Sequence, residues 1–205
     1  MPARAGLDTN AVVRAAAEMA DADGLHPLSL ARLAERLGVR VPSLYNHVQG
    51  LPGLRRALAL YGIGALHDAL ASAAIGRSGD EAVFALAAAY RNFVKAHPGL
   101  YEAMTRTPPG QDAEVAAASA APVEVVQAVL AGYGLQGDDA VHAVRGLRSL
   151  VHGFVTLEVS GGFGMPLDVD ESFRRLLRTY VAGLRPAPAT PPPLPGQSAG
   201  RSISR

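Results

Sequence analysis

The feature that most constrains the fold is a tight turn between two short helices near the N-terminus. Ser29 is a good N-cap residue, and the stretch after it carries an apolar stripe at helical spacing, formed by Leu30, Leu33, Ala34 and Leu37. Gly38 follows at once and can adopt the left-handed conformation that ends a helix. Pro42 suits the first position of the next helix, where its missing N–H costs nothing. This order predicts a helix-turn-helix unit.

The remaining chain shows the same helical periodicity, and no segment alternates as a half-buried strand would. We therefore predict an all-α fold. Asp8 suits the N-cap of a first helix, Pro98 predicts a helix end, and residues 105–112 are predicted to form a loop. The other expected helices span about Thr9–Ala22, Pro52–Ala73, Glu81–Ala96, Pro122–Ala131, a long segment capped by Asp138 and broken at 161–166, and Glu171–Leu184.

Composition excludes several classes of protein. The chain has no cysteine, which rules out disulfides and thiolate chemistry. No apolar run approaches the roughly 20 residues that span a bilayer, and the first residues lack the hydrophobic segment of a signal peptide. We expect a soluble, cytoplasmic protein with no membrane partner.

The charge distribution is more informative than the formal net charge of +1. Residues 32–56 contain five arginines and one glutamate, a local excess that suits phosphate but also occurs on ordinary solvated helix faces. The arginines are Arg32, Arg36, Arg40, Arg55 and Arg56.

The third helix divides into an inward and an outward side. At 100° per residue, Leu44 and Val48 point inward, and the opposite side carries Pro42, Tyr45, Asn46 and, at its margin, Ser43. Amide and small side chains fit base edges, and hydroxyl groups bond bases or phosphates. The outward side carries no carboxylate that DNA would repel. It is therefore predicted to read DNA.

These residues resemble a known family. Residues 28–58, LSLARLAERLGVRVPSLYNHVQGLPGLRRAL, are similar to the N-terminal domain of TetR-family (tetracycline-repressor-like) transcriptional regulators. The segment RSLVHGFVTLEVSGGFG at 148–164 resembles the C-terminal domain of one TetR subgroup, which has a similar His-Gly-Phe segment. One departure is Leu51, which stands where many members have a phosphate-contacting lysine; Arg55 and Arg56 are the expected substitutes.

The resemblance implies a ligand-responsive regulator, expected to be a repressor, that binds double-stranded operator DNA as a homodimer and is released by a small-molecule effector. It implies a DNA-binding domain at 1–52 and a ligand-binding and dimerisation domain at 53–185. Residues 186–205 contain six prolines and are expected to be disordered. The resemblance also implies which residues contact DNA. Ser29 is expected near phosphate, and the other expected contact residues are Arg40, Val41, Pro42, Ser43, Tyr45, Asn46 and His47.

Two further sets of residues belong to the C-terminal domain. The expected ligand-binding residues are Tyr90, Phe93, Tyr101, Met104, His152 and Phe154. The expected dimer interface, a four-helix arrangement, uses Val151, Val155, Phe173, Leu177, Tyr180 and Val181.

An alternative is a helical enzyme or small-molecule-binding protein whose helix-turn-helix makes another contact. No acid/base pair or partnered nucleophile occurs at helical spacing, so we expect no catalytic residue and no enzyme. The six histidines do not form a zinc-binding pattern, so we expect no metal site and no cofactor. His47 and His152 also fit roles in packing within the domain.

Overall fold

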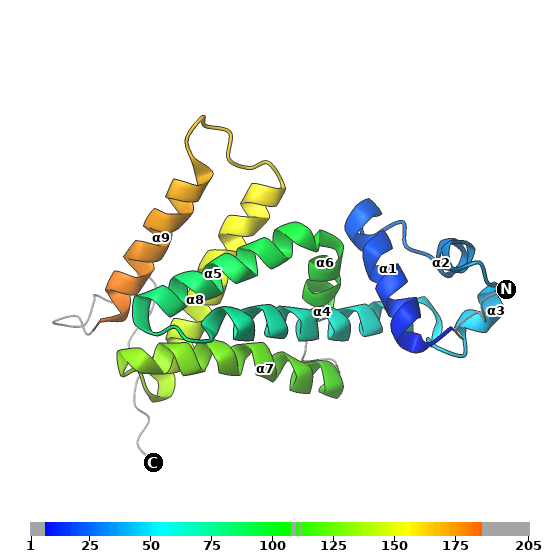
Figure 1. Cartoon of the computed structure of the whole chain (residues 1–205), viewed down its shortest axis with the longest axis horizontal. Helices are drawn as coiled ribbons and strands as arrows, with labels where there is room; N and C mark the ends of the chain where they lie inside the picture. Colours follow the sequence, from blue (N-terminus) through cyan, green and yellow to red (C-terminus); the bar gives the residue numbers. More distant parts are fainter. Residues whose placement is uncertain (1–6, 108–109, 111, 186–205) are drawn as a thin grey trace, which may run out of the picture.

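The computed structural model describes residues 7–107, 110 and 112–185, and that part of the chain contains helices and no strand. A small group of helices lies at one end of a larger helical bundle (Figure 1). The predicted all-α fold is confirmed. The elements are α1 (Thr9–Asp23), α2 (Leu30–Leu37), α3 (Val41–Leu44), α4 (Gly50–Ala74), α5 (Gly79–Ala96), α6 (Pro98–Arg106), α7 (Ala113–Leu130), the 3₁₀ helix η2 (Ala131–Tyr133), α8 (Gly137–Val159) and α9 (Val169–Leu184).

The caps predicted for the first two helices are confirmed. The Asp8 carboxylate accepts a hydrogen bond from the N–H of Ala11 at 2.6 Å, and the Ser29 hydroxyl accepts one from the N–H of Arg32 at 3.3 Å. Gly38 has a φ of 65°, in the left-handed region, and ends α2. This conformation turns the chain into α3 within three residues.

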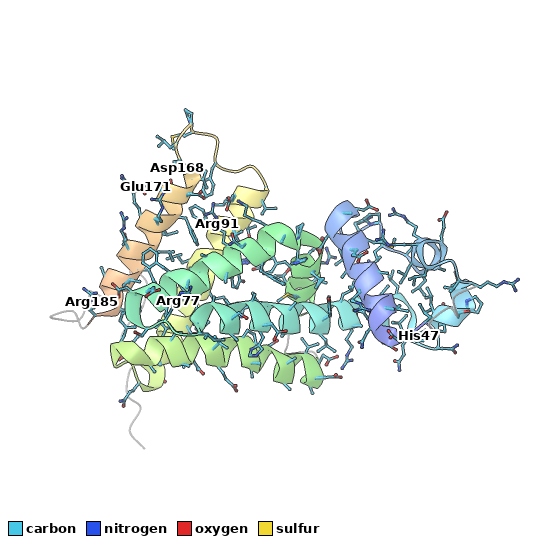
Figure 2. The ribbon with its side chains drawn as sticks, viewed as in Figure 1. His47, Arg77, Arg91, Asp168, Glu171 and Arg185 are labelled. Atoms are coloured by element: carbon cyan, nitrogen blue, oxygen red, sulfur yellow. The ribbon has the colours of Figure 1, made fainter. Side chains whose placement is uncertain are left out.

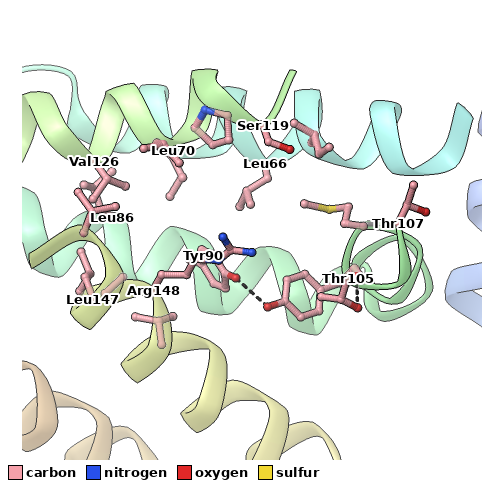
Figure 3. A pocket seen from close by; sticks show the side chains of 18 residues that line it. Leu66, Leu70, Leu86, Tyr90, Thr105, Thr107, Ser119, Val126, Leu147 and Arg148 are labelled. Carbon is pink, nitrogen blue, oxygen red and sulfur yellow. Dashed lines mark hydrogen bonds between the residues drawn. The ribbon is translucent and has the colours of Figure 1, made fainter. Parts of the chain in front are cut away.

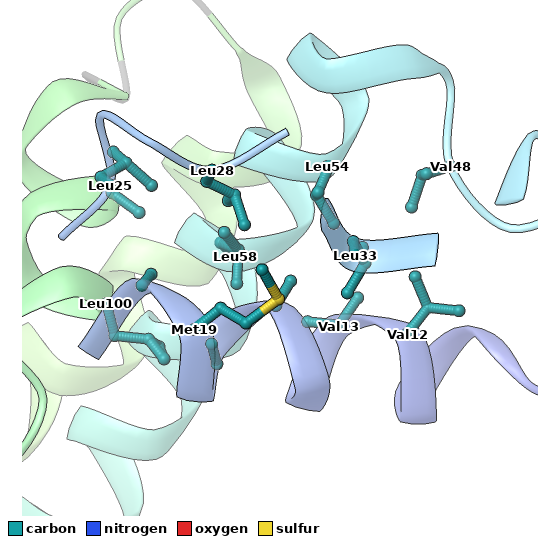
Figure 4. Packing of buried hydrophobic residues seen from close by; sticks show 14 of the residues in the cluster. Val12, Val13, Met19, Leu25, Leu28, Leu33, Val48, Leu54, Leu58 and Leu100 are labelled. Carbon is teal, nitrogen blue, oxygen red and sulfur yellow. The ribbon is translucent and has the colours of Figure 1, made fainter. Parts of the chain in front are cut away.

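We call α1 to α3 and the first turns of α4 the head. Its core contains completely buried leucines from three helices, Leu33, Leu44 and Leu54, packed with residues of α1 such as Val12 (Figure 4). Each fully buried leucine stabilises the fold by about 1.5–3 kcal/mol. The head is therefore held by the apolar stripes seen in the sequence.

The rest of α4 with α5 to α9 forms the body, and α4 runs through both parts. Leu54 and Leu58 of α4 lie in the core of the head, whereas Leu66 and Leu70 lie in a core of the body. The expected domain boundary at 52/53 thus falls in the first turn of this helix. A single rigid helix connects the two parts.

The C-terminal helices of the body are tied by a polar cluster as well as an apolar core. Arg91 of α5 is buried and bonds the carboxylate of Glu158 on α8 at 2.6 and 2.7 Å. It also pairs with Asp170 at the start of α9, at 2.7 Å. The guanidinium lies over the ring of Phe173, 4.9 Å from its centroid. Three helices therefore meet at one arginine.

Two prolines have positions that were not expected. The helix before Pro98 ends at Ala96 as predicted, but Pro98 also starts α6, because its missing N–H is harmless in the first turn. Part of the expected loop at 105–112 is therefore helical. Pro122 was expected to begin a helix, but it lies inside α7, which starts nine residues earlier behind the N-cap Asp112. The N-cap bonds of Asp112 to two backbone N–H groups stabilise this earlier start.

Other helix ends differ by a few residues from those expected. Helices α4 and α5 begin two residues early, and α3 begins at Val41, which puts Pro42 at its second position. Asp138 lies in the first turn of α8, with Gln136 as N-cap, and α9 begins behind Asp168. The proline-rich segment 186–205 lies outside the described residues.

Two helices, α4 and α7, are long and apolar enough to cross a membrane by length and composition alone. The sequence did not indicate this, because polar residues interrupt the apolar residues of both helices. In the fold, α4 packs against α1, α5, α6 and α7, so its apolar side chains serve the two protein cores.

Candidate functional site

The outward side of α3 is the first candidate site. Leu44 is completely buried and Val48 is buried, whereas Tyr45 is 61% exposed. Pro42 and Asn46 are also exposed. The predicted division into anchors and an exposed polar side is confirmed.

The helical part of α3 is shorter than expected, but the turn geometry continues past it. The N–H of Tyr45 donates to the carbonyl of Pro42 at 3.3 Å, and the N–H of His47 donates to that of Leu44 at 2.9 Å. Tyr45 has helical backbone angles. The side chains after Leu44 therefore keep nearly the direction that a longer helix would give them.

Four other predicted residues are half-buried: Ser29, Val41, Ser43 and His47. His47 Nδ1 lies 3.4 Å from Thr9 Oγ1, which connects the end of the α3 segment to the start of α1 (Figure 2). Val41 packs against the head core, and the Ser29 hydroxyl caps α2. These side chains shape the head in addition to any contact they make outside it.

The arginine excess in residues 32–56 is largely neutralised by the fold. Arg32 pairs with Asp23 at 2.6 Å and Arg36 with Glu18 at 2.5 Å. These carboxylates come from α1, outside the window that was counted. Among the described residues, exposed Arg40 has no carboxylate partner. Among the arginines of residues 32–56, it is the one best placed to meet phosphate.

Neither expected substitute for the missing lysine is a fully exposed cation, since Arg55 and Arg56 are both half-buried. Leu51 itself is half-buried and packs against the head core. Arg56 bonds Asp112, and its Nη2 lies 2.5 Å from Glu114 of α7. The hydrogen bond from Arg56 lowers the pKa of the Asp112 carboxyl to about 2, so this pair is charged throughout the physiological range. Arg56 therefore connects α4 to α7, and its guanidinium is already occupied.

The second candidate site is a cavity in the body. It encloses about 130 Å³ between α4, α5, α6, α7 and α8 (Figure 3). Its walls are mostly apolar, including Ile63, Leu66, Leu70, Leu86, Val126, Val144, Leu147 and Val151. A mostly apolar hollow with a few polar groups is the usual form of a small-molecule site.

A chain of hydrogen-bonded polar groups lies on one side of the cavity, in addition to the lining residues Thr105, Thr107 and Ser119. The hydroxyl groups of Tyr90 and Tyr101 lie 2.7 Å apart, and the Tyr101 hydroxyl is also bonded to His152 Nδ1. Burial raises the pKa of both tyrosines, so both remain neutral hydroxyls. The side chain of Arg148 extends from α8 to the same region (Figure 3).

The expected ligand-binding residues are only partly brought together. Tyr90, Tyr101 and Met104 line the cavity, and His152 reaches it through Tyr101. Phe93 and Phe154 do not line it, because they pack elsewhere: Phe93 against His97, and Phe154 against the rings of Phe163 and Phe173. These two assignments receive no support from the structure.

Sequence reasoning missed the cationic residue of the cavity. Arg148 lies one helical turn before His152, a residue that the sequence had already suggested for ligand contact. Their spacing of four residues places both on one side of α8 and was the available signal.

Known proteins resemble both parts of this chain. The family model described as "Tetracyclin repressor-like, C-terminal domain" matches residues 83–180. The uncharacterized HTH-type transcriptional regulator YobS of Bacillus subtilis is 39% identical over 184 residues, which cover 90% of this chain and 96% of that protein. The chain belongs to the TetR family of transcriptional regulators.

Two further proteins support the assignment of this TetR-family chain. The HTH-type regulator Rv0681 of Mycobacterium tuberculosis is 39% identical over 181 residues, covering 88% of this chain and 83% of that protein. A TetR variant of Acinetobacter baumannii AYE, solved in complex with minocycline, matches with a TM-score of 0.67 and 26% identity over 88% of this chain and 99% of that chain. The protein is thus a TetR-type transcriptional regulator and not an enzyme.

The expected dimer interface of this TetR-family protein stays a prediction, and the burial of its residues within one chain weighs against it. Five of the six residues are buried within the single chain: Val151, Val155, Phe173, Leu177 and Val181. Val151 even lines the cavity. Side chains already covered by their own chain have little surface to offer a partner. The sixth, Tyr180, is half-buried and donates its hydroxyl to the carbonyl of Ala143 at 2.6 Å.

Head and body of the TetR-family fold also meet through α6. Asp21 at the end of α1 accepts a hydrogen bond from the N–H of Leu100 at 3.0 Å, and it lies 2.8 Å from His97 Nδ1. Tyr101 and Met104, on the same short helix, line the cavity. One helix therefore contacts both α1 of the head and the cavity of the body.

Proposed function

We propose that this protein is a cytoplasmic, ligand-responsive repressor that binds operator DNA as a homodimer and is released by a small-molecule effector. The observation that carries the proposal is the shared position of α6, between the cavity and α1 of the head. A ligand that moves α6 also moves the helix on which it rests. The A. baumannii TetR variant solved with minocycline supports a small-molecule site in this fold.

The DNA contact is assigned to the exposed side of α3 and the turn after it. Tyr45 and Asn46 have the exposure and chemistry for base edges in the major groove. Arg40, with no carboxylate partner among the described residues, is assigned to the phosphate backbone. Two heads of a dimer would need a separation of about 34 Å to read successive major grooves.

The homodimer is assigned to an exposed surface of α8 and α9. We call it the α8/α9 face and define it by Leu150, Gly153, Leu157, Leu176, Thr179 and Gly183. On each helix these residues follow one another at intervals of three and four, so they share one side. Leu157 and Leu176 are exposed, which makes them more suitable than the buried residues first expected. Small residues between them allow two helices to approach a second pair closely.

The release of the protein from operator DNA is assigned to a shift in population between two conformations that differ in the position of α6. A ligand in the cavity contacts Tyr101 and Met104 and favours one position of α6 over another. Because α6 contacts α1 through Asp21, that preference alters the spacing of the two heads and lowers operator affinity.

A gel-shift titration with the DNA that flanks the protein's own gene tests the proposal. Wild type should bind specifically, and Asn46→Ala or Tyr45→Ala should each lose about 1–3 kcal/mol of discrimination. Glu124→Ala, at an exposed position of α7 remote from the head, serves as a matched control and should bind as wild type. Unchanged specific binding by both head variants would rule out this reading surface.

A further inference from the structure

The cavity contains one cationic side chain in a mostly apolar surrounding. Arg148 is among the residues that line it, and no aspartate or glutamate is among them. Within the described part of the chain Arg148 has no carboxylate partner, in contrast to Arg91 and Arg56. The segments outside that part contain no aspartate or glutamate side chain. The positive charge is therefore not compensated by an acidic side chain.

The two tyrosine hydroxyls extend this polar wall. Each hydroxyl has one proton, and the Tyr90–Tyr101–His152 chain can be ordered in either direction. When His152 Nδ1 donates to Tyr101, the Tyr101 proton points to Tyr90, and Tyr90 is left with a free O–H. In that order the wall presents the O–H of Tyr90 together with the N–H groups of Arg148, and both are donors.

We infer that the effector is a small apolar carboxylate, whose charged oxygens contact Arg148 and Tyr90 and whose hydrocarbon part lies among the aliphatic side chains. This inference rests on the proposed ligand response. A guanidinium prefers a carboxylate because two parallel N–H bonds match two oxygens. An apolar body on such a ligand fits Leu66, Leu70 and Leu86 on the walls away from Arg148.

The cavity volume sets the size of the ligand. A cavity of about 130 Å³ is comparable with the 150 Å³ or so of an engineered apolar cavity that binds benzene. It therefore suits one aromatic ring or a short alkyl chain. Benzoate and hexanoate represent these two shapes, each with a single carboxylate.

Calorimetric titration of the full chain tests the inference, with benzoate and hexanoate as anions, benzyl alcohol and hexanol as neutral probes, and hexylamine as a cation. Both carboxylates, or the better fitting one, should bind at least tenfold more tightly than the matching alcohol. Arg148→Met keeps the length of the side chain and removes its charge. It should weaken carboxylate binding about 10- to 100-fold and leave alcohol binding unchanged.

Arg145→Met is the matched control, because Arg145 is exposed on the same helix and does not line the cavity. It should bind every probe as wild type does. Both positions are exposed, so the melting temperature of each variant should stay close to that of wild type. Tyr90→Phe is a second variant, expected to weaken carboxylate binding by a smaller factor.

The outcomes separate this inference from the proposed function. Any of three results would overturn the anion site. The first is that an alcohol or the amine binds as tightly as the carboxylates or more tightly, and the second is that no carboxylate binds at millimolar concentration. The third is that Arg148→Met binds the carboxylates as tightly as wild type does. A gel shift is then measured with the same probes. Carboxylate binding without operator release supports the anion site and contradicts the ligand response, whereas release by the neutral probes alone supports the response and overturns the anion site.

Discussion

Gly99 of α6 packs directly against the backbone carbonyl of Ala20 in α1. A Cβ atom built on Gly99 would lie 2.1 Å from the Ala20 oxygen and 2.7 Å from the nitrogen of Asp21. Both neighbours are backbone atoms, which cannot rotate away as a side chain can. The contact between head and body at this point therefore requires a residue without a side chain.

Gly99→Ala should separate α6 from α1 and destabilise the protein by about 1–3 kcal/mol, the usual cost of overpacking. Operator affinity should fall as well, since the position of the head depends on this contact. Urea unfolding and a gel shift measure the two effects. Gly64→Ala is the control: Gly64 lies in α4 with open space around it, so alanine there should raise stability by about 0.5–1 kcal/mol. A Gly99→Ala protein as stable as wild type would show that the helices can shift apart without cost.

The two arginines Arg40 and Arg56 should differ in their effect on salt dependence. Arg40→Gln should reduce the slope of log affinity against log salt by about 1.8 for the dimer, because each of its two heads loses one phosphate contact worth about 0.9. Arg56→Gln should leave the slope unchanged, because its guanidinium already bonds Asp112 and Glu114. Operator titrations at several salt concentrations provide the slopes. A reduced slope for Arg56→Gln would mean that Arg56 leaves Asp112 when DNA binds.

The α8/α9 face predicts which substitutions produce monomers. Leu157→Glu and Leu176→Glu introduce charge at exposed positions, so the chain should remain folded while its self-association is lost. Sedimentation velocity measures the oligomeric state, and circular dichroism checks the fold. Val141→Glu, an exposed position of α8 outside this face, is the control and should behave as wild type. Dimers that persist in both leucine variants would place the interface elsewhere.

The Arg91–Glu158 pair predicts a pH dependence of stability. Hydrogen bonding from Arg91, followed by that from Lys95, lowers the pKa of Glu158 to about 2 from its ordinary value of 4.5. A lowered pKa in the folded state means that the pair stabilises the protein above about pH 4.5 and that this contribution is lost as the pH falls toward 2. Glu158→Gln should cost roughly 2 kcal/mol at pH 7.

Urea unfolding at pH 7 and at pH 3 distinguishes this cause from general acid denaturation. The difference in unfolding free energy between Glu158→Gln and wild type should shrink at the lower pH, because wild type also loses part of its charged pair there. Glu124→Gln, exposed on α7, should show no such difference at either pH. A difference that is the same at both pH values would rule out titration of Glu158 as its source.

The helix-turn-helix unit was predictable from the sequence because its determinants are local. The caps at Asp8 and Ser29, the left-handed Gly38 and the inward Leu44 each act over a few residues, and the structure has all four. The starts of the helices that contain Pro98 and Pro122 were predicted less well. Proline is compatible with more than one position in a helix, and the choice between them depends on packing and on caps such as Asp112.

The sequence by itself determined the all-α class, the division of α3 into a buried and an exposed side, and the family. Only the tertiary structure decided which partners the other residues have. An apolar stripe shows that Val151 and Leu177 are buried, but burial against the same chain and burial against a second copy produce the same pattern. Likewise, the packing of helices brings together side chains that are far apart in the sequence. It pairs Arg56 with Asp112 and makes Arg148 part of the lining of a cavity. Periodicity records that a side chain is buried, and the fold decides what buries it.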